Sequence, residues 1–158
     1  MARPAVLLDT NLLILFVVGL ASPEYVARHR RLSAYRGYGR RAFDILLDYV
    51  SLASALLVTP NVLTEVSNLL AGRERGDDIT LAVLHAFRSL VGRADERLIS
   101  SAAAMTRPES PRLGLADAAT LEALGTETVL LTDDWSLYEA ALRAGKRAEL
   151  FSHYLTRP

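Results

Sequence analysis

The sequence predicts an α/β protein, a three-layer α/β/α sandwich with a central parallel sheet. Strand-like apolar runs alternate with segments of helical periodicity along the 158 residues, an order typical of βαβ units. The first run, Ala5–Leu8, is apolar at every position, as expected of a strand that is covered on both faces. The length suits about one domain, and 51% of the residues are hydrophobic. We therefore expect a single domain over residues 1–158.

In the N-terminal half, Asn11 is expected to cap the helix that follows the first strand. Ser22, Pro23 and Glu24 together form a helix start, with a capping Ser, a Pro at the first position and an acid in the first turn. Pro60 closes the second strand, and apolar residues at helical spacing predict the other helices. The predicted segments are a strand at 5–8, a helix at 11–18, a helix start at 22–24, a helix at 41–53, a strand at 56–59 and helices at 61–72 and 77–91.

In the C-terminal half, Gly125 and Gly145 stand where two predicted helices end, a position that favours glycine. A proline-containing loop is expected at 107–112. The predicted segments are a helix or turn at 101–105, a helix at 115–124, a strand at 128–131, a helix at 135–144 and a strand at 148–151.

Composition excludes several classes of site. The chain has no Cys, which excludes a disulfide framework and a thiolate ligand or nucleophile. Its three His residues are too scattered in sequence to suggest a zinc site. The apolar stretch at 12–21 has about half the length that a bilayer span needs, and Arg3 alone makes a poor signal-peptide n-region. We expect a cytoplasmic protein with no membrane partner.

Acidic residues follow two predicted strands and begin two predicted helices. Asp9 ends the first strand, Asp133 and Asp134 follow the strand at 128–131, and Glu65 and Asp117 lie near helix starts. Because ligands of open parallel sheets bind beyond the carboxyl ends of the strands, we expect these acids to meet at one edge. Their mutual repulsion is relieved by a divalent cation, and hard carboxylate ligands favour Mg²⁺ or Mn²⁺.

Each acid also has a local interpretation. Asp9 can be a plain helix cap or a buried polar residue, and Glu65 and Asp117 gain about 0.3–1 kcal/mol from a helix dipole. Asp133 and Asp134 both precede the helix that starts at Trp135, and we expect Asp133 to be its cap.

Four segments resemble, in chain order, the motifs of PIN-domain ribonucleases, a family that includes the toxins of bacterial VapBC-type toxin–antitoxin pairs. They are Leu-Leu-Asp-Thr-Asn at 7–11, Leu-Thr-Glu-Val at 63–66, Gly-Leu-Ala-Asp-Ala-Ala at 114–119 and Leu-Thr-Asp-Asp at 131–134. The resemblance covers residues 5–151 and implies a PIN-like fold. It also implies an endoribonuclease that hydrolyses RNA phosphodiester bonds with Mg²⁺ or Mn²⁺.

The resemblance also implies the roles of individual residues. Its last motif is usually Thr-x-Asp, which selects Asp134 over Asp133, and Ser136 stands where a further acid often follows. The implied catalytic residues are Asp9, Glu65, Asp117 and Asp134, with Asp9, Asp117 and Asp134 on the metal. The implied supporting residues are Thr10, Asn11, Thr132 and Asp133. The implied partners are an RNA substrate, an antitoxin protein and a second copy of the chain in a homodimer.

The segment 28–41 carries six Arg and no acid, so the remainder of the chain has a net charge of −6. It belongs to an Arg-rich helical insertion expected at about 22–54. Arg side chains bind phosphates and Tyr side chains stack on bases, which indicates RNA contacts. An acidic protein partner or a merely solvated basic face remains open. The candidate RNA-binding residues are Arg28, Arg30, Arg31, Tyr35, Arg36, Tyr38, Arg40 and Arg41.

Other functions also fit parts of the pattern. A non-catalytic PIN-like domain that binds RNA or a protein is one alternative, suggested by Ser136. A phospho-accepting receiver needs a lysine near the acids, but the single lysine, Lys146, lies beyond Gly145. A phosphatase with an Asp nucleophile usually has a second Asp two residues on, where this chain has Asn11. Trp135 and Tyr138 are expected to pack beside the site.

Overall fold

The computed structural model describes residues 2–71 and 77–156, and its strands form one parallel sheet in the order β3-β2-β1-β4-β5. The register places Leu7 of β1 beside Leu57 of β2 and Leu130 of β4. From the central strand β1, the chain adds β2 and β3 on one side of the sheet and then β4 and β5 on the other. The strands are β1 (Ala5–Leu8), β2 (Leu56–Val58), β3 (Asp95–Glu96), β4 (Thr128–Thr132) and β5 (Arg147–Leu150).

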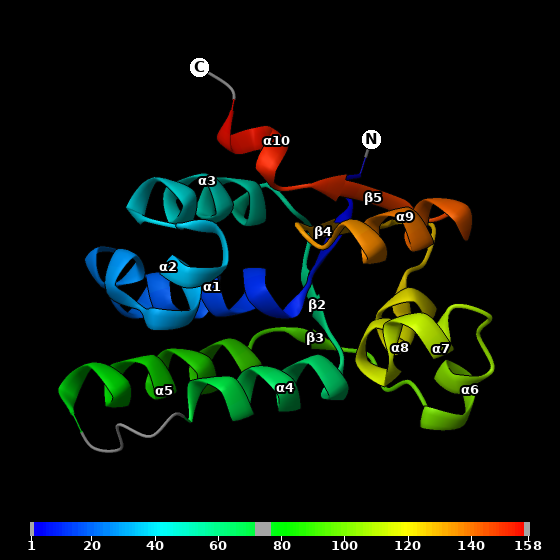
Figure 1. Cartoon of the computed structure of the whole chain (residues 1–158), viewed down its shortest axis with the longest axis horizontal. Coiled ribbons are helices and arrows are strands. Elements are labelled where there is room, and N and C mark those ends of the chain that lie inside the picture. Colours follow the sequence, from blue (N-terminus) through cyan, green and yellow to red (C-terminus); the bar gives the residue numbers. More distant parts are fainter. Residues whose placement is uncertain (1, 72–76, 157–158) are drawn as a thin grey trace.

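Helices cover both faces of the sheet, as the three-layer prediction requires. Alternate side chains of the central strands enter two separate cores, because successive residues of a strand point to opposite faces. Val6 and Leu8 pack with α1 (Thr10–Ala21), α3 (Arg40–Ser51), α4 (Pro60–Leu70) and α5 (Asp78–Val91). Figure 1 shows α1 between α3 on one side and α4 and α5 on the other.

The opposite face is covered by α8 (Leu115–Ala123) and α9 (Trp135–Arg143), whose apolar residues pack on Leu7, Leu57 and Leu130. The shorter helical segments are η1 (Pro23–Arg28), α2 (Arg30–Arg36), α6 (Ser101–Met105), α7 (Ser110–Leu113) and α10 (Ser152–Leu155).

Helix α1 is buried from Leu12 to Gly19, which is why its sequence is apolar on every side. No helix in the described part of the chain is both long and apolar enough to cross a membrane. A Cβ added to Gly19 would lie 1.9 Å from Cδ2 of Phe43. Gly19 therefore allows the Phe43 ring of α3 to pack directly on α1.

The structure corrects several predicted boundaries. Asp9, not Asn11, caps the first helix, which continues to Ala21. Thr59 lies outside the second strand and caps α4, so that Pro60 rather than Asn61 is its first residue. The loop predicted at 107–112 is confirmed only for 107–109, because α7 begins at Ser110. The strand β3 was not predicted, since its two exposed acidic residues carry no strand pattern. Gly72, the predicted end of the fourth helix, lies outside the described residues.

Candidate active site

The candidate site lies where the chain order of the sheet reverses. Asp9 follows β1 and Asp134 follows β4, and these strands are neighbours. The helices that leave them, α1 and α9, cover opposite faces of the sheet. Adjacent strands that send their helices to opposite faces leave a crevice at their carboxyl ends, where open α/β sheets bind ligands.

Asp9 is buried, with 6% of its surface exposed, and both carboxylate oxygens are hydrogen-bonded. Oδ1 accepts a bond of 2.8 Å from the Leu12 amide, and Oδ2 accepts bonds from the Thr132 hydroxyl and from the Asp133 amide at 3.2 Å. Burial raises the pKa of Asp9 to about 6, although these three donors oppose the shift. Asp9 is therefore a helix cap, as its local interpretation predicted, and its carboxylate also binds the residues at the end of β4.

Thr132 connects Asp9 to Asp134. Its hydroxyl donates to Asp9 and accepts a bond of 2.9 Å from the Asp134 amide. Oδ1 of Asp134 accepts from the Leu137 amide at 3.0 Å and so caps α9. The prediction that Asp133 caps this helix is wrong, because Asp134 occupies the capping position.

Glu65 is joined to the same group from α4. Oε2 of Glu65 accepts a hydrogen bond of 2.6 Å from the hydroxyl of Thr10, the residue after Asp9. The bond joins the first turn of α1 to α4, between residues 55 positions apart in the chain. Glu65 is exposed, and this single bond orients its carboxylate.

Asp117 completes the group from the first turn of α8. Burial, followed by the negative charges of Asp134, Asp9 and Glu65, raises its pKa to about 7. An electrostatic effect of this kind requires the carboxylates to lie near one another. Four acids from four different elements therefore share one region, the carboxyl edge of the sheet.

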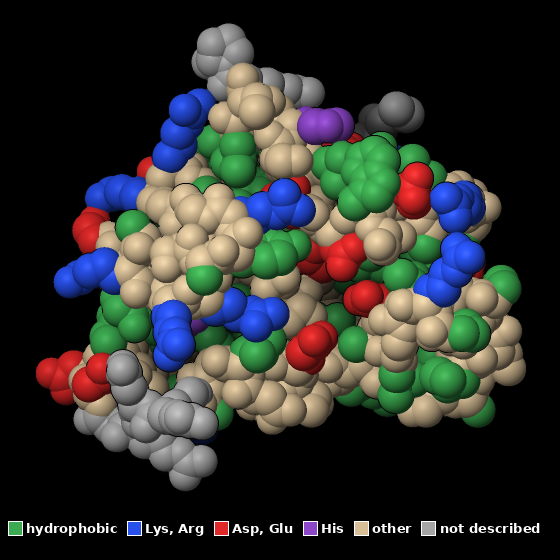
Figure 2. All heavy atoms as spheres, viewed as in Figure 1, with side chains coloured by type: hydrophobic (Ala, Val, Ile, Leu, Met, Phe, Trp, Pro, Cys, Tyr) green, Lys and Arg blue, Asp and Glu red, His purple; other side chains and the backbone are tan. Residues whose placement is uncertain are grey.

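Positive side chains do not neutralise this acidic cluster, meaning Asp9, Glu65, Asp117 and Asp134. None of the ion pairs found in residues 2–71 and 77–156 involves any of the four. Figure 2 shows acidic side chains gathered in a hollow near the middle of the visible face, with basic side chains on both sides of it. The cluster is thus an uncompensated negative site, which attracts cations.

As the side chains lie, no three His, Asp or Glu residues of the described chain are arranged to hold one metal ion. The chemistry of the acidic cluster nevertheless fits a hard cation. Three donors already occupy Asp9, which leaves one of about four acceptor positions. Within the described residues, the second oxygen of Asp134 accepts no hydrogen bond, and none is found to the Asp117 carboxyl. Mg²⁺ takes one or two carboxylates and keeps its other waters, so Asp117 and Asp134 suffice as direct ligands.

Asp133 is a buried structural residue whose carboxylate is occupied by partners outside the acidic cluster. Its carboxylate accepts hydrogen bonds from the Tyr38 hydroxyl and from the Ser152 amide at 2.7 Å. Its carbonyl oxygen accepts a bond of 2.6 Å from Arg36. Asp133 thus fixes the Arg-rich segment to the end of β4.

The Arg-rich segment is only partly available for RNA. Tyr38 is 2% exposed, so the prediction that it stacks on bases is wrong. Burial and the Asp133 carboxylate raise the pKa of Tyr38. Arg40 forms ion pairs with Glu24 and Asp44, and these two carboxylates weaken its attraction for an anionic ligand.

Two arginines of this segment border the crevice. Arg31 donates to the side-chain oxygen of Asn11 at 2.9 Å, so Asn11 binds an arginine rather than an acid. Arg36 reaches the end of β4, and its guanidinium lies 5.2 Å from the Tyr35 ring centre. Arg28, Arg30, Tyr35 and Arg41 are exposed.

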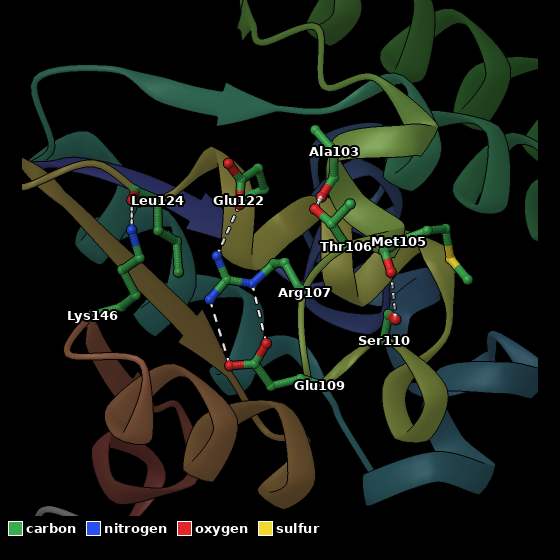
Figure 3. A network of polar contacts seen from close by, with 9 residues as sticks. All are labelled: Ala103, Met105, Thr106, Arg107, Glu109, Ser110, Glu122, Leu124 and Lys146. Atoms are coloured by element: carbon green, nitrogen blue, oxygen red, sulfur yellow. Dashed lines mark hydrogen bonds and ion pairs between the residues drawn. The ribbon is translucent and has the colours of Figure 1, made fainter.

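An ion-pair network contacts helix α8, which carries Asp117, through Glu122 (Figure 3). Arg107 contacts Glu109 at 3.3 Å and Glu122 of α8 at 2.8 Å. This network fastens the segment between α6 and α7 to α8. Arg107 was predicted only as the start of a loop, and no local pattern indicates its partners.

Two features beside the acidic cluster were not predicted as functional. Trp135, expected to pack, is 58% exposed, and Arg112 lines a cleft between α7 and α9. The position of Trp135 directly after an acidic motif was the available signal.

No protein-family model matches the chain, and no curated protein matches it.

Proposed function

We propose that this chain is a PIN-like, metal-dependent endoribonuclease that hydrolyses RNA phosphodiester bonds with Mg²⁺ or Mn²⁺. The observation that supports it most is the convergence of Asp9, Glu65, Asp117 and Asp134 at the carboxyl edge of the sheet. The hydrogen bonds from Thr132 to Asp9 and from Thr10 to Glu65, together with the effect of three acids on the pKa of Asp117, support this grouping.

In this proposal Asp117 and Asp134 hold the cation, and Asp9 contributes through its remaining acceptor position or through a water. A bound divalent cation activates the attacking water and offsets the charge that develops on the phosphoryl oxygens. We assign to Glu65 the acceptance of the proton of that water, because it is exposed and Thr10 orients only one of its oxygens. Thr132 and Thr10 are positioning residues.

Cleavage of a labelled RNA by purified protein tests the proposal. We expect cleavage with Mg²⁺ or Mn²⁺, none after chelation, and a loss of at least 100-fold in kcat for Glu65→Gln, as for removal of a general base. The matched control is Glu127→Gln, an exposed glutamate in a loop before β4, which should cleave at the original rate. Equal cleavage by both variants would contradict the proposal and indicate a contaminating nuclease.

A second candidate is a non-catalytic PIN-like domain that binds RNA or a protein. Three hydrogen-bond donors already occupy the Asp9 carboxylate, as in a purely structural residue, and this favours the second candidate. Calorimetric titration with Mn²⁺ distinguishes the two. Binding that Asp117→Asn abolishes supports the enzyme, whereas no binding at millimolar Mn²⁺ supports the scaffold.

The toxin role is a further proposal that rests on the resemblance to VapBC-type toxins. It predicts growth arrest on expression in a bacterium, prevented by Glu65→Gln. Harmless expression of a chain that cleaves RNA in vitro would instead indicate a processing or decay nuclease. A homodimer, proposed on the same ground, is tested by light scattering.

A further inference from the structure

Trp135 is an exposed aromatic side chain immediately beside the acidic cluster. It follows Asp134 directly, opens α9 and has 58% of its surface exposed. Tyr138 lies one turn further, with its ring centre 5.5 Å from that of Trp135. Burial normally stabilises a large aromatic side chain, and Trp135 lacks most of it. An exposed indole at the border of a site therefore indicates that it binds a ligand.

A cleft between α7 and α9 continues from the same turn. It has a volume of about 290 Å³, and Arg112, Ser136, Glu139 and Arg143 are among the residues that line it. Ser136 lies two residues after Asp134, and Arg112 lies five residues before Asp117. Each wall of the cleft is therefore close in sequence to one acid of the cluster.

Arg112 is the cation of this cleft that has no carboxylate partner. Arg143 pairs with Glu139 at 3.3 Å, and Glu109 of the cleft wall pairs with Arg107 at 3.3 Å. Among the ion pairs of the described residues, none involves Arg112. Its guanidinium is thus available to bind an anion, and phosphate is the anion that arginine binds best through paired hydrogen bonds.

We infer that the first turn of α9 and helix α7 form a subsite for an unpaired nucleotide of an RNA strand, with its base stacked on Trp135 and a neighbouring phosphate bound by Arg112. The inference rests on the proposed nuclease function and assigns the residues of this chain that would bind one unpaired nucleotide of its substrate. A base inside a duplex is stacked on both faces, so only an unpaired base can use an exposed indole.

The opposite border of the acidic cluster supports the same path for the strand. Arg36 and Arg31 lie at the ends of β4 and β1 through their bonds to Asp133 and Asn11. Figure 2 shows basic side chains on both sides of the acidic hollow. A strand held by arginines on either side would pass its backbone across the acids, where the proposed cleavage takes place.

Fluorescence of Trp135 tests the inference directly, because it is the single tryptophan of the chain. The full-length protein is titrated in EDTA, which prevents cleavage, with an unlabelled uridine decamer. We expect quenching that saturates with the single strand and is much weaker for a hairpin duplex of equal length. Arg112→Ala should raise the Kd about ten- to 150-fold with the same final quench, as for loss of one charge-assisted bond. Arg88→Ala, an exposed arginine of α5, is the matched control and should leave the Kd unchanged.

Variants of Trp135 separate stacking from a structural role. Measured by anisotropy of a labelled decamer, Trp135→Leu should weaken binding about five- to hundredfold, the range for one stacked base, and Trp135→Tyr should restore most of it. Trp135 is exposed, so both variants should keep the circular dichroism spectrum of the original protein.

Three results would overturn the subsite: binding by anisotropy without quenching, equal effects of Arg112→Ala and Arg88→Ala, or equal quenching by a glutamate decamer. The last would identify an acidic peptide as the ligand. If metal-dependent cleavage persists with an unchanged KM in Trp135→Leu, the subsite fails and the nuclease stands. If the decamer quenches Trp135 but no cleavage occurs with metal, the nuclease fails and the subsite stands.

Discussion

Replacing Asp117 by Asn should stabilise the metal-free protein while abolishing its proposed activity. The carboxyl of Asp117 is half-buried, and burial together with the charges of Asp134, Asp9 and Glu65 raises its pKa to about 7. At neutral pH the fold must therefore keep a carboxylate that its surroundings disfavour. Asparagine has nearly the same shape and no charge, so it removes the repulsion without leaving a cavity.

The magnitude follows from the pKa. The difference between about 7 in the fold and 3.8 ordinarily corresponds to about 4 kcal/mol, at about 1.36 kcal/mol per pH unit. Partial solvent exposure and the loss of about 0.3–1 kcal/mol of helix-dipole stabilisation reduce this. We expect a net gain of about 1–3 kcal/mol at pH 8.

The pH dependence has a defined sign. A carboxyl with a raised pKa stabilises the fold most when it is protonated, and this contribution is lost as the pH rises from about 4 to about 7. The original protein therefore loses stability over this range through Asp117, and Asp117→Asn does not. The difference between the two should be larger at pH 8 than at pH 5.

Urea unfolding in EDTA at pH 5 and pH 8 provides the measurement. Asp48→Asn, on the exposed face of α3, is the control and should change the free energy of unfolding by less than about 0.5 kcal/mol at either pH. Adding Mg²⁺ should stabilise the original protein more than Asp117→Asn. The raised pKa of Asp117 is contradicted if Asp117→Asn is no more stable than the original protein at pH 8, or if the difference does not depend on pH.

Two further predictions concern packing and the Arg-rich segment. Gly19→Ala should destabilise the protein by about 1–3 kcal/mol in thermal or urea unfolding, because the added Cβ overlaps the Phe43 ring. Gly92→Ala is the control and should not destabilise the protein in this way, because the nearest atom to the added Cβ is 3.6 Å away. Equal losses of unfolding free energy in the two variants would show that the close approach at Gly19 is absent. Tyr38→Phe should cost about 1.5–3 kcal/mol, since it removes a hydrogen bond to the buried Asp133 carboxylate; an unchanged unfolding midpoint would contradict that contact.

Much of the fold was predictable because it depends on local pattern. Two strands were recognisable from their composition alone. The run at 5–8 is apolar throughout and the strand that ends at Thr132 is mostly apolar, as expected of buried strands. The positions of Asp9 and Asp134 followed from those strands, since parallel strands bring their carboxyl ends to one edge.

The remaining features depend on contacts between distant parts of the chain. Tyr38 and Asp133 are 95 residues apart, and no local signal in the Arg-rich segment separates a buried tyrosine from an exposed one. Capping depends on which of two adjacent acids faces the helix, so the cap of α9 was assigned to Asp133 although Asp134 provides it. The exposure of Trp135 is also a tertiary property, because its sequence neighbours are those of an ordinary amphipathic helix.

A crystal of the protein soaked in Mn²⁺, with anomalous data collected at the manganese edge, is the most direct test of the acidic cluster. The proposed metal site predicts at least one anomalous peak within coordination distance of Asp117 and Asp134, beside Asp9 and Glu65. Absence of a peak there at 10 mM Mn²⁺, about tenfold above the weak limit of the Kd range of protein sites for hard divalent cations, would contradict it.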